Sequence, residues 1–172
     1  MNPFMMIVVI IGVVVLVAAL LIKIKKDTSN SNSVLRKKNI KLGLQSMEKV
    51  DSIKMAGRLL VESGYVSENY IQAMLQREED LTTYIGNGVA IPHGIGAAKK
   101  EVKKTGISIL QFPQGVDFGE EKAYLIIGIA GAGNEHLEIL ANLASIMEDE
   151  SVAAQLRKTT DVDFVYRLFT KQ

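Results

Sequence analysis

The stretch Tyr124–Ala130 (YLIIGIA) indicates the fold class of this 172-residue chain. It is aliphatic and apolar at successive positions, which is typical of a strand that helices cover on both faces. Ile107–Phe112 (ISILQF) is similarly aliphatic and β-branched. The run Val89–Ile91 predicts a brief strand that is cut off at Pro92. We therefore expect three strands in this part of the chain.

Helical patterns alternate with these strands. The first helix is indicated by apolar residues at helical spacing across 50–60, ahead of a C-terminal stop at Gly64. Four further helices are predicted from candidate N-cap residues: Ser67, Asn134, Asp149 and Asp161. The helix after Asn134 should extend to about Met147. This order predicts a single α/β domain, and covering its sheet uses most of the residues, so we expect no second catalytic domain.

The first 22 residues (MNPFMMIVVIIGVVVLVAALLI) carry no charged side chain, although the chain has 20 Lys and Arg and 19 Asp and Glu. As a helix they would span about 33 Å, enough for a hydrocarbon core of about 30 Å. Basic residues follow directly in Lys23–Lys26. The positive-inside rule therefore predicts a single-pass transmembrane helix at 1–22 in the cell membrane, with the C-terminal domain facing the cytoplasm.

A cleaved signal peptide is the main alternative to this anchor, and a buried core segment is another. A signal peptide usually has a basic start, a shorter apolar run and a small-residue cleavage site, and residues 1–26 lack this pattern. Residues 23–33 contain the polar run DTSNSNS and predict a flexible linker, so the folded domain is expected at 34–172. The basic residues of Lys23–Lys26 and Arg36–Lys38 either set the topology or also touch anionic lipid head groups.

The composition excludes several kinds of chemistry. The chain has no Cys, which rules out disulfides, thiolate nucleophiles and cysteine zinc sites. Two His leave little material for a histidine metal site, and a net charge of +1 gives no basic field for nucleic acid. The two histidines are then the strongest candidates for a nucleophile or a general base.

His93 lies in the segment Gly86–Gly94 (GNGVAIPHG), where a predicted strand ends. Pro92 fixes one backbone angle, and Gly94 lets the chain leave in directions that other residues avoid. The imidazole is thereby expected at the carboxyl edge of the sheet, where α/β proteins tend to bind ligands. Local sequence alone leaves two interpretations open, a nucleophile and a turn histidine that makes one backbone hydrogen bond.

His136 and Arg77 are the other candidate site residues. His136 is expected in the first turn of the helix that Asn134 caps, where free N–H groups favour an anion. Arg77 closes the second predicted helix, and a guanidinium is a good partner for a phosphoryl group. The alternatives are a surface histidine and a solvated cation at a helix end.

From about Val34 to the C-terminus the chain resembles the enzyme IIA domain of the mannitol/fructose class (type 2) of the sugar phosphotransferase system, and it is most similar to the mannitol type. The resemblance is carried by Glu78, six further residues and Ile85–Gly94 (IGNGVAIPHG). Further agreement lies in four short segments: Thr105–Gly106, Gln111–Gly119, Asn134–His136 and Asp149–Val152. These matches occur in order over roughly four-fifths of the chain, so they are more specific than a lone motif.

The resemblance implies a single domain with a mixed sheet between helices, and it assigns roles to three residues. His93 corresponds to the phosphorylated histidine of the family, His136 to its second active-site histidine, and Arg77 to an arginine near the phosphoryl group. Some members carry an acidic residue where this chain has Asn87. A role for that carboxylate therefore does not transfer to this chain.

The resemblance also implies an activity and its partners. Phospho-HPr would donate a phosphoryl group to His93, and a cysteine of enzyme IIB would accept it for sugar uptake, with no metal or other cofactor. The alternative is a membrane-tethered regulatory module that is phosphorylated or docks partners without feeding a transporter. A membrane-anchored scaffold with an inactive site is a third interpretation.

Overall fold

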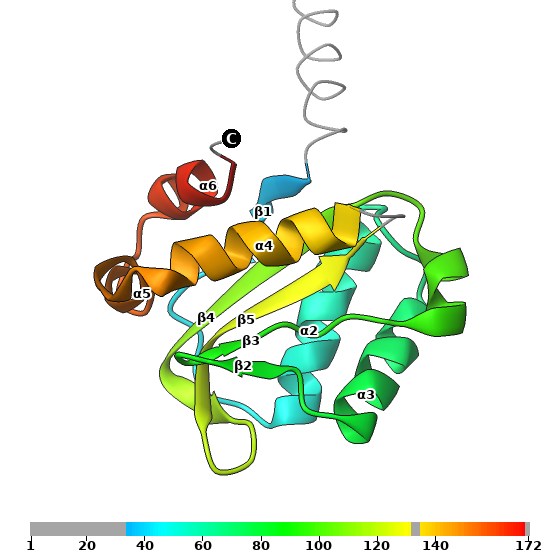
Figure 1. The fold of residues 1–172 in the computed structure, drawn as a ribbon, viewed down its shortest axis with the longest axis horizontal. Helices are drawn as coiled ribbons and strands as arrows, with labels where there is room; N and C mark the ends of the chain where they lie inside the picture. Colours follow the sequence, from blue (N-terminus) through cyan, green and yellow to red (C-terminus); the bar gives the residue numbers. More distant parts are fainter. Residues whose placement is uncertain (1–33, 132–134, 171–172) are drawn as a thin grey trace, which may run out of the picture. The chain divides into compact units, whose positions relative to one another are not determined.

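A computed structural model describes residues 34–131 and 135–170, which form a five-stranded mixed sheet with helices on both faces (Figure 1). The strand order is β1-β4-β5-β3-β2. β1 and β4 are parallel, β4 and β5 antiparallel, β5 and β3 parallel, and β3 and β2 antiparallel. The strands are β1 (Leu35–Lys41), β2 (Tyr84–Gly86), β3 (Val89–Ala90), β4 (Gly106–Asp117) and β5 (Lys122–Ala130). The expected single α/β domain with a mixed sheet is confirmed.

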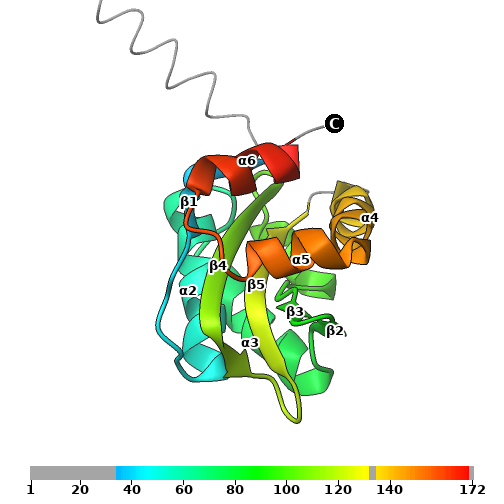
Figure 2. The same ribbon diagram turned by 90° about the vertical axis from the view of Figure 1, so that its left-hand side faces the viewer.

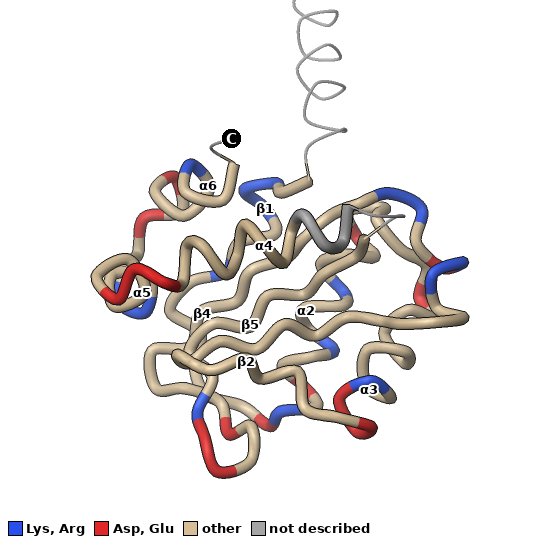
Figure 3. Tube along the Cα trace, viewed as in Figure 1, with Lys and Arg blue, Asp and Glu red and all other residues tan. Residues whose placement is uncertain are grey.

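The two central strands, β4 and β5, are buried on both faces. In β5, Ile126 and Ala130 belong to one hydrophobic cluster, whereas Leu125, Ile127 and Ile129 belong to the other. Alternate residues of a strand point to opposite faces, so a strand between two helical layers must be apolar at successive positions. This requirement explains the uninterrupted run YLIIGIA. Lys and Arg, blue in Figure 3, and Asp and Glu, red there, are absent from the middle of both strands.

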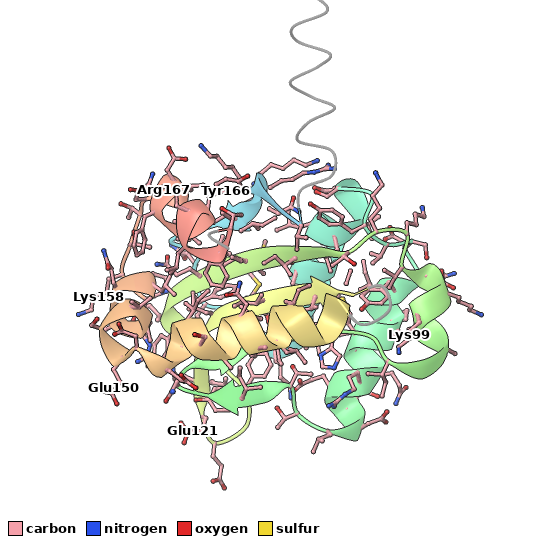
Figure 4. All side chains as sticks on the ribbon, turned by 45° about the horizontal axis from the view of Figure 1, so that its top comes forward. Lys99, Glu121, Glu150, Lys158, Tyr166 and Arg167 are labelled. Carbon is pink, nitrogen blue, oxygen red and sulfur yellow. The ribbon has the colours of Figure 1, made fainter. Side chains whose placement is uncertain are left out.

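Helices α2 and α3 cover one face of the sheet, and α4, α5 and α6 cover the other (Figures 1 and 2). Their bounds are α2 (Lys49–Glu62), α3 (Tyr70–Asp80), α4 (Glu135–Glu148), α5 (Glu150–Leu156) and α6 (Val162–Thr170). Asp149 and Asp161 cap α5 and α6 as predicted, because their side chains accept hydrogen bonds from backbone N–H groups in the first turns of these helices. Many charged side chains lie at the periphery, as Figure 4 shows for Lys99, Glu150 and Arg167.

Three predictions from the sequence differ from the structure. β1, β2 and the 3-10 helix η2 (Gly96–Glu101) were not predicted. β2 has three residues, too few for a periodic pattern, and β1 and η2 are largely polar: in the seven-residue β1 the buried apolar side chains are Leu35 and Ile40. The strand at Ile107–Phe112 is longer and extends over Gly106–Asp117. Ser67 does not cap α3, because its hydroxyl donates to the Glu101 carboxylate and the helix begins at Tyr70.

The membrane prediction concerns residues outside this description. No helix within residues 34–131 and 135–170 is long and apolar enough to cross a membrane. The predicted anchor at 1–22 and linker at 23–33 both lie outside the described residues, as does the predicted cap Asn134.

Candidate phosphoryl-transfer site

The parallel pairing of β3 with β5 determines where His93 lies. The two-residue β3 pairs Val89 with Leu125, and the contact continues beyond the strand, where Ile129 N–H donates to the Pro92 carbonyl at 2.9 Å. His93 and Ile129 form a parallel bridge. His93 thus lies at the carboxyl edge of the sheet, beside the end of β5, where the sequence predicts it. Ligands of open α/β sheets bind at this edge.

The ring of His93 has a defined orientation. Its Nδ1 lies 2.7 Å from the Ile91 carbonyl oxygen, and the residue is 8% exposed. A carbonyl oxygen only accepts hydrogen bonds, so Nδ1 must carry the proton in this contact. In the neutral ring, Nε2 then holds the lone pair. His93 therefore has the tautomer of a nucleophile that reacts through Nε2.

The surroundings of His93 favour its neutral form. Burial lowers the pKa of His93 below its ordinary value of 6.5, the hydrogen bond to Ile91 opposes this change, and the positive charge of Arg77 adds to it. The pKa of His93 is lowered by the three effects together. A neutral imidazole at pH 7 keeps its lone pair available.

Arg77 lies in the last turn of α3, and its charge acts on His93. Its Nη1 donates to the Leu81 carbonyl at 2.5 Å, just beyond the end of the helix. This bond holds the guanidinium at the turn between α3 and β2. The structure thus brings Arg77 within electrostatic reach of His93, although the two residues come from different elements.

His136 lies in the first turn of α4, which begins at Glu135. β5 ends at Ala130, next to the backbone of His93, so the start of α4 follows closely from the strand end that adjoins the candidate nucleophile. The predicted position of His136 in the first turn is confirmed. Its side chain lies outside the described part of the structure.

A buried carboxylate beneath the site had no role assigned from the sequence. Glu78 is 6% exposed, and it accepts hydrogen bonds from the backbone N–H and the hydroxyl of Thr83, both at 2.6 Å. Lys49 Nζ and Thr82 Oγ1 donate to its other oxygen at 3.1 and 3.0 Å. Burial alone would raise the pKa of Glu78, but these hydrogen bonds outweigh it, and the pKa lies below its ordinary value.

This network extends to the ring of His93. Ile91 N–H donates to the Thr83 carbonyl at 3.0 Å, and the Ile91 carbonyl faces His93 Nδ1. Glu78 therefore holds Thr83 in place, and the Thr83 carbonyl holds Ile91. Ile91 in turn orients the imidazole of His93. No feature of the sequence alone shows which carboxylate will be buried, so only its place in the family signature singled out Glu78.

Asn87 lies away from the site. It occupies the turn between β2 and β3 with a positive φ of 51°, and Gly88 follows with a φ of 73°. Positive φ at both central residues is what a two-residue hairpin turn of type I′ requires. This turn is at the opposite end of β3 from His93, and its backbone carbonyl accepts a hydrogen bond from Arg157 at 2.6 Å. Asn87 thus has a structural function in the hairpin.

Exposed apolar side chains occur in the segments around His93. Among the described residues, the large apolar side chains that are exposed include Leu81 after α3, Ile85 on β2 and Ile95 two residues after His93. A partner covers such side chains where they form one continuous patch. Within the described residues no group of three or more His, Asp or Glu side chains could hold a metal ion.

The fold and the signature define a phosphotransferase component. Residues 33–172 match the family model described as the phosphoenolpyruvate-dependent sugar phosphotransferase system, EIIA 2, and the chain belongs to this family. The family predicted from the signature is confirmed.

Similar proteins include members of the mannitol type. The mannitol-specific phosphotransferase enzyme IIA component of Bacillus subtilis is 46% identical over 134 residues, which are 77% of this chain and 94% of that protein. The mannitol-specific EIICBA component of Klebsiella pneumoniae is 45% identical over 148 residues, and the chain covers 23% of its length. A solved complex of enzyme IIAMTL and phosphorylated enzyme IIBMTL from Escherichia coli matches with a TM-score of 0.75 and 43% identity, covering 80% of this chain and 99% of that one.

Proposed function

We propose that His93 is the phosphoacceptor of a mannitol-type IIA carrier, which receives a phosphoryl group from phospho-HPr and passes it to a cysteine of enzyme IIB. The observation that carries the proposal is the 2.7 Å contact of His93 Nδ1 with the Ile91 carbonyl. It leaves the lone pair on Nε2, in a ring whose environment disfavours protonation.

Each transfer exchanges one bond to phosphorus for another. The Nε2 lone pair of His93 attacks the phosphorus of the donor phosphohistidine in line, while the donor P–N bond breaks and its electron pair returns to the donor imidazole. In the second step the thiolate of the acceptor attacks, and the P–N bond to His93 breaks in the same way. Phosphoryl transfer of this kind depends on positioning and on charge stabilisation rather than on further covalent chemistry.

Arg77 and His136 would stabilise the phosphoryl oxygens in these steps. A guanidinium provides planar N–H donors that suit phosphoryl oxygens. The free N–H groups and the dipole at the start of α4 favour an anion at the end of β5, and His136 in that turn can add a hydrogen bond. Removing either side chain is expected to slow transfer without preventing the attack by Nε2.

The mannitol class and the partners are inferred from the relatives. The Bacillus subtilis and Klebsiella pneumoniae proteins are named for mannitol, and the Escherichia coli structure pairs a similar IIA with a phosphorylated IIB. The exposed side chains of Leu81, Ile85 and Ile95 support docking of a protein partner over His93.

We also propose that residues 1–22 anchor the carrier in the cell membrane, that 23–33 form a flexible linker, and that the domain at 34–172 faces the cytoplasm. The support is the uncharged apolar sequence of 1–22, followed by Lys23, Lys25 and Lys26. Such an anchor would keep the carrier near a membrane-bound sugar transporter.

A reconstituted phosphotransfer assay tests the function. The full-length chain is incubated with phosphoenolpyruvate, enzyme I and HPr, and candidate IIB domains are then added. We expect the phosphoryl group of phosphoenolpyruvate, used as the label, to appear on His93 and then to pass to a mannitol-type IIB. Absence of the label contradicts the carrier function, whereas labelling that no IIB domain accepts favours the regulatory alternative.

His93→Ala should abolish phosphorylation while the domain stays folded, because the ring donates to a carbonyl of its own loop, that of Ile91. His136→Ala is the matched control, since it removes the chain's other imidazole but leaves the proposed nucleophile. It should slow labelling by about 10- to 100-fold rather than abolish it. Circular dichroism and thermal unfolding would check the fold, and a large loss of thermal stability in His93→Ala would make His93 a structural residue instead.

A further inference from the structure

The hydroxyl of Tyr70 holds the backbone directly after His93. Gly94 N–H donates to Tyr70 Oη at 2.9 Å, and Tyr70 Oη donates to the Ile129 carbonyl at 2.8 Å. Tyr70 is the first residue of α3 and is 1% exposed. A single buried hydroxyl therefore connects three elements: the start of α3, the loop after His93 and the end of β5.

The ring of Tyr70 also packs closely against the same loop. A Cβ placed on Gly94 would lie 2.8 Å from Cε2 of Tyr70, a separation that side chains do not tolerate. Gly94 is not among the glycines with a positive φ, so the close approach of the ring accounts for the glycine better than backbone conformation does.

His93 is thus fixed on each side by a different contact. Ile129 N–H donates to the Pro92 carbonyl before it, Gly94 N–H donates to Tyr70 after it, and the Ile91 carbonyl accepts from the ring. Two of the three contacts are made by the chain backbone. The Tyr70 hydroxyl is the one made by a distant side chain, and burial raises its pKa, so it remains protonated and able to donate.

We propose that Tyr70 is a positioning residue for phosphoryl transfer, which holds the His93–Gly94 backbone so that the imidazole keeps its Nδ1 contact and presents Nε2 in line. The inference rests on the proposed function of His93. Tyr70 itself touches no reacting atom. Its contribution is geometric, and small misplacements of a nucleophile cost up to about 100-fold in rate.

Tyr70→Phe tests this role, because it removes the hydroxyl and keeps the ring. We expect phosphorylation of the full-length variant by phospho-HPr to be about tenfold slower than in the wild type, at a temperature where both are folded. Tyr65→Phe is the matched control, since Tyr65 is equally buried but its ring lies against Gly106 and Arg36. A Tyr70→Phe rate within about twofold of the Tyr65→Phe rate overturns the proposal.

The ring nitrogens of His93 give a second measurement that requires no phosphotransfer. The chain has two histidines, so ¹⁵N-histidine labelling yields two ring systems, and His93→Ala identifies which signals belong to His93. We expect the Nδ1–H tautomer in the wild type and a mixture of tautomers in Tyr70→Phe. If phospho-HPr never phosphorylates the wild type, the proposed function of His93 fails. An unchanged tautomer in Tyr70→Phe would instead overturn the positioning role.

Gly94→Ala provides a variant that keeps every group that hydrogen bonds around His93, including the Tyr70 hydroxyl. Its methyl group would push the loop away from the Tyr70 ring, so phosphorylation should slow here as well, by about tenfold. If Tyr70→Phe does not fold, Gly94→Ala tests the positioning role of Tyr70 in its place. A wild-type phosphorylation rate in Gly94→Ala would then overturn the proposal.

Discussion

At the residue scale, the chemistry depends on which nitrogen of His93 carries its proton. The Ile91 carbonyl selects the tautomer, whereas burial and Arg77 keep the ring neutral. The two effects act on different properties, orientation and charge. A variant that alters one need not alter the other, so they can be measured separately.

The titration of His93 should show the effect of burial. Its pKa in the folded protein should lie below 6.5, and ¹⁵N NMR of the ring nitrogens between pH 4 and 8 would measure it. Because the folded pKa is lowered, His93 contributes full stability above pH 6.5, and this contribution falls as the pH drops from 6.5 toward the folded pKa. A midpoint at or above 6.5 would contradict this interpretation.

Glu78→Gln should destabilise the domain by about 2 kcal/mol, because the buried hydrogen bonds from Thr83 are made to a charged acceptor. The folded pKa of Glu78 is below its ordinary 4.5, so its carboxylate stabilises the fold above pH 4.5 and less as the pH falls below that value. Urea denaturation at pH 7 and at pH 3.5 would measure this.

The difference between the wild type and Glu78→Gln should be smaller at pH 3.5 than at pH 7. Glu79→Gln is a suitable control, since Glu79 is the exposed neighbour on the same helix. Equal losses for the two variants would mean that the Glu78 network does not stabilise the turn after α3.

At the element scale, the hairpin of β2 and β3 is held from outside by α5. Arg157 follows that helix, donates to the Asn87 carbonyl and lies over the Tyr124 ring, 4.9 Å from its centre. A Cβ on Gly88 would lie 2.7 Å from the same ring, so the turn is closely packed as well as hydrogen bonded. The C-terminal helices thereby fix the end of the hairpin that is distant from His93.

Arg157→Ala should cost about 1 kcal/mol of stability and speed amide exchange in the β2–β3 turn, because it removes one hydrogen bond and one cation–π contact. The rate of His93 phosphorylation should change by less than about twofold, since the turn lies at the other end of β3. Hydrogen exchange and the labelling assay would measure the two effects, with the exposed Lys158→Ala as control. A tenfold loss of rate would contradict the separation of turn and site.

At the scale of the whole molecule, residues 34–172 should be an independent folding unit. Val34–Gln172 form one compact unit, and the two hydrophobic clusters of the described residues lie entirely within it. The fragment 34–172 should therefore unfold in one cooperative thermal transition followed by circular dichroism. A broad, non-cooperative transition would show that residues 1–33 contribute to the fold.

The sequence was informative where burial is continuous and uninformative where contacts are tertiary. A strand between two helical layers must be apolar throughout, so Tyr124–Ala130 was predictable. β1 is an edge strand with mostly polar residues, and no periodicity marked it. The strand end at Pro92 placed His93 correctly. The roles of Glu78 and Tyr70 depend on packing of α3 against distant loops, which a linear pattern does not show.

The two edges of the sheet also bear on how the protein behaves when crowded. An unpaired strand edge can recruit a strand from another molecule and begin aggregation. Here β2 has three residues and ends at Gly86 with a φ of 95°, and β1 carries Arg36, Lys37, Lys38 and Lys41. The β2 edge is too short to pair with another strand. The β1 edge is basic, so it repels the β1 edge of a second molecule. Molecules confined at high local density should therefore stay separate, so that His93 of each one remains accessible to a partner protein.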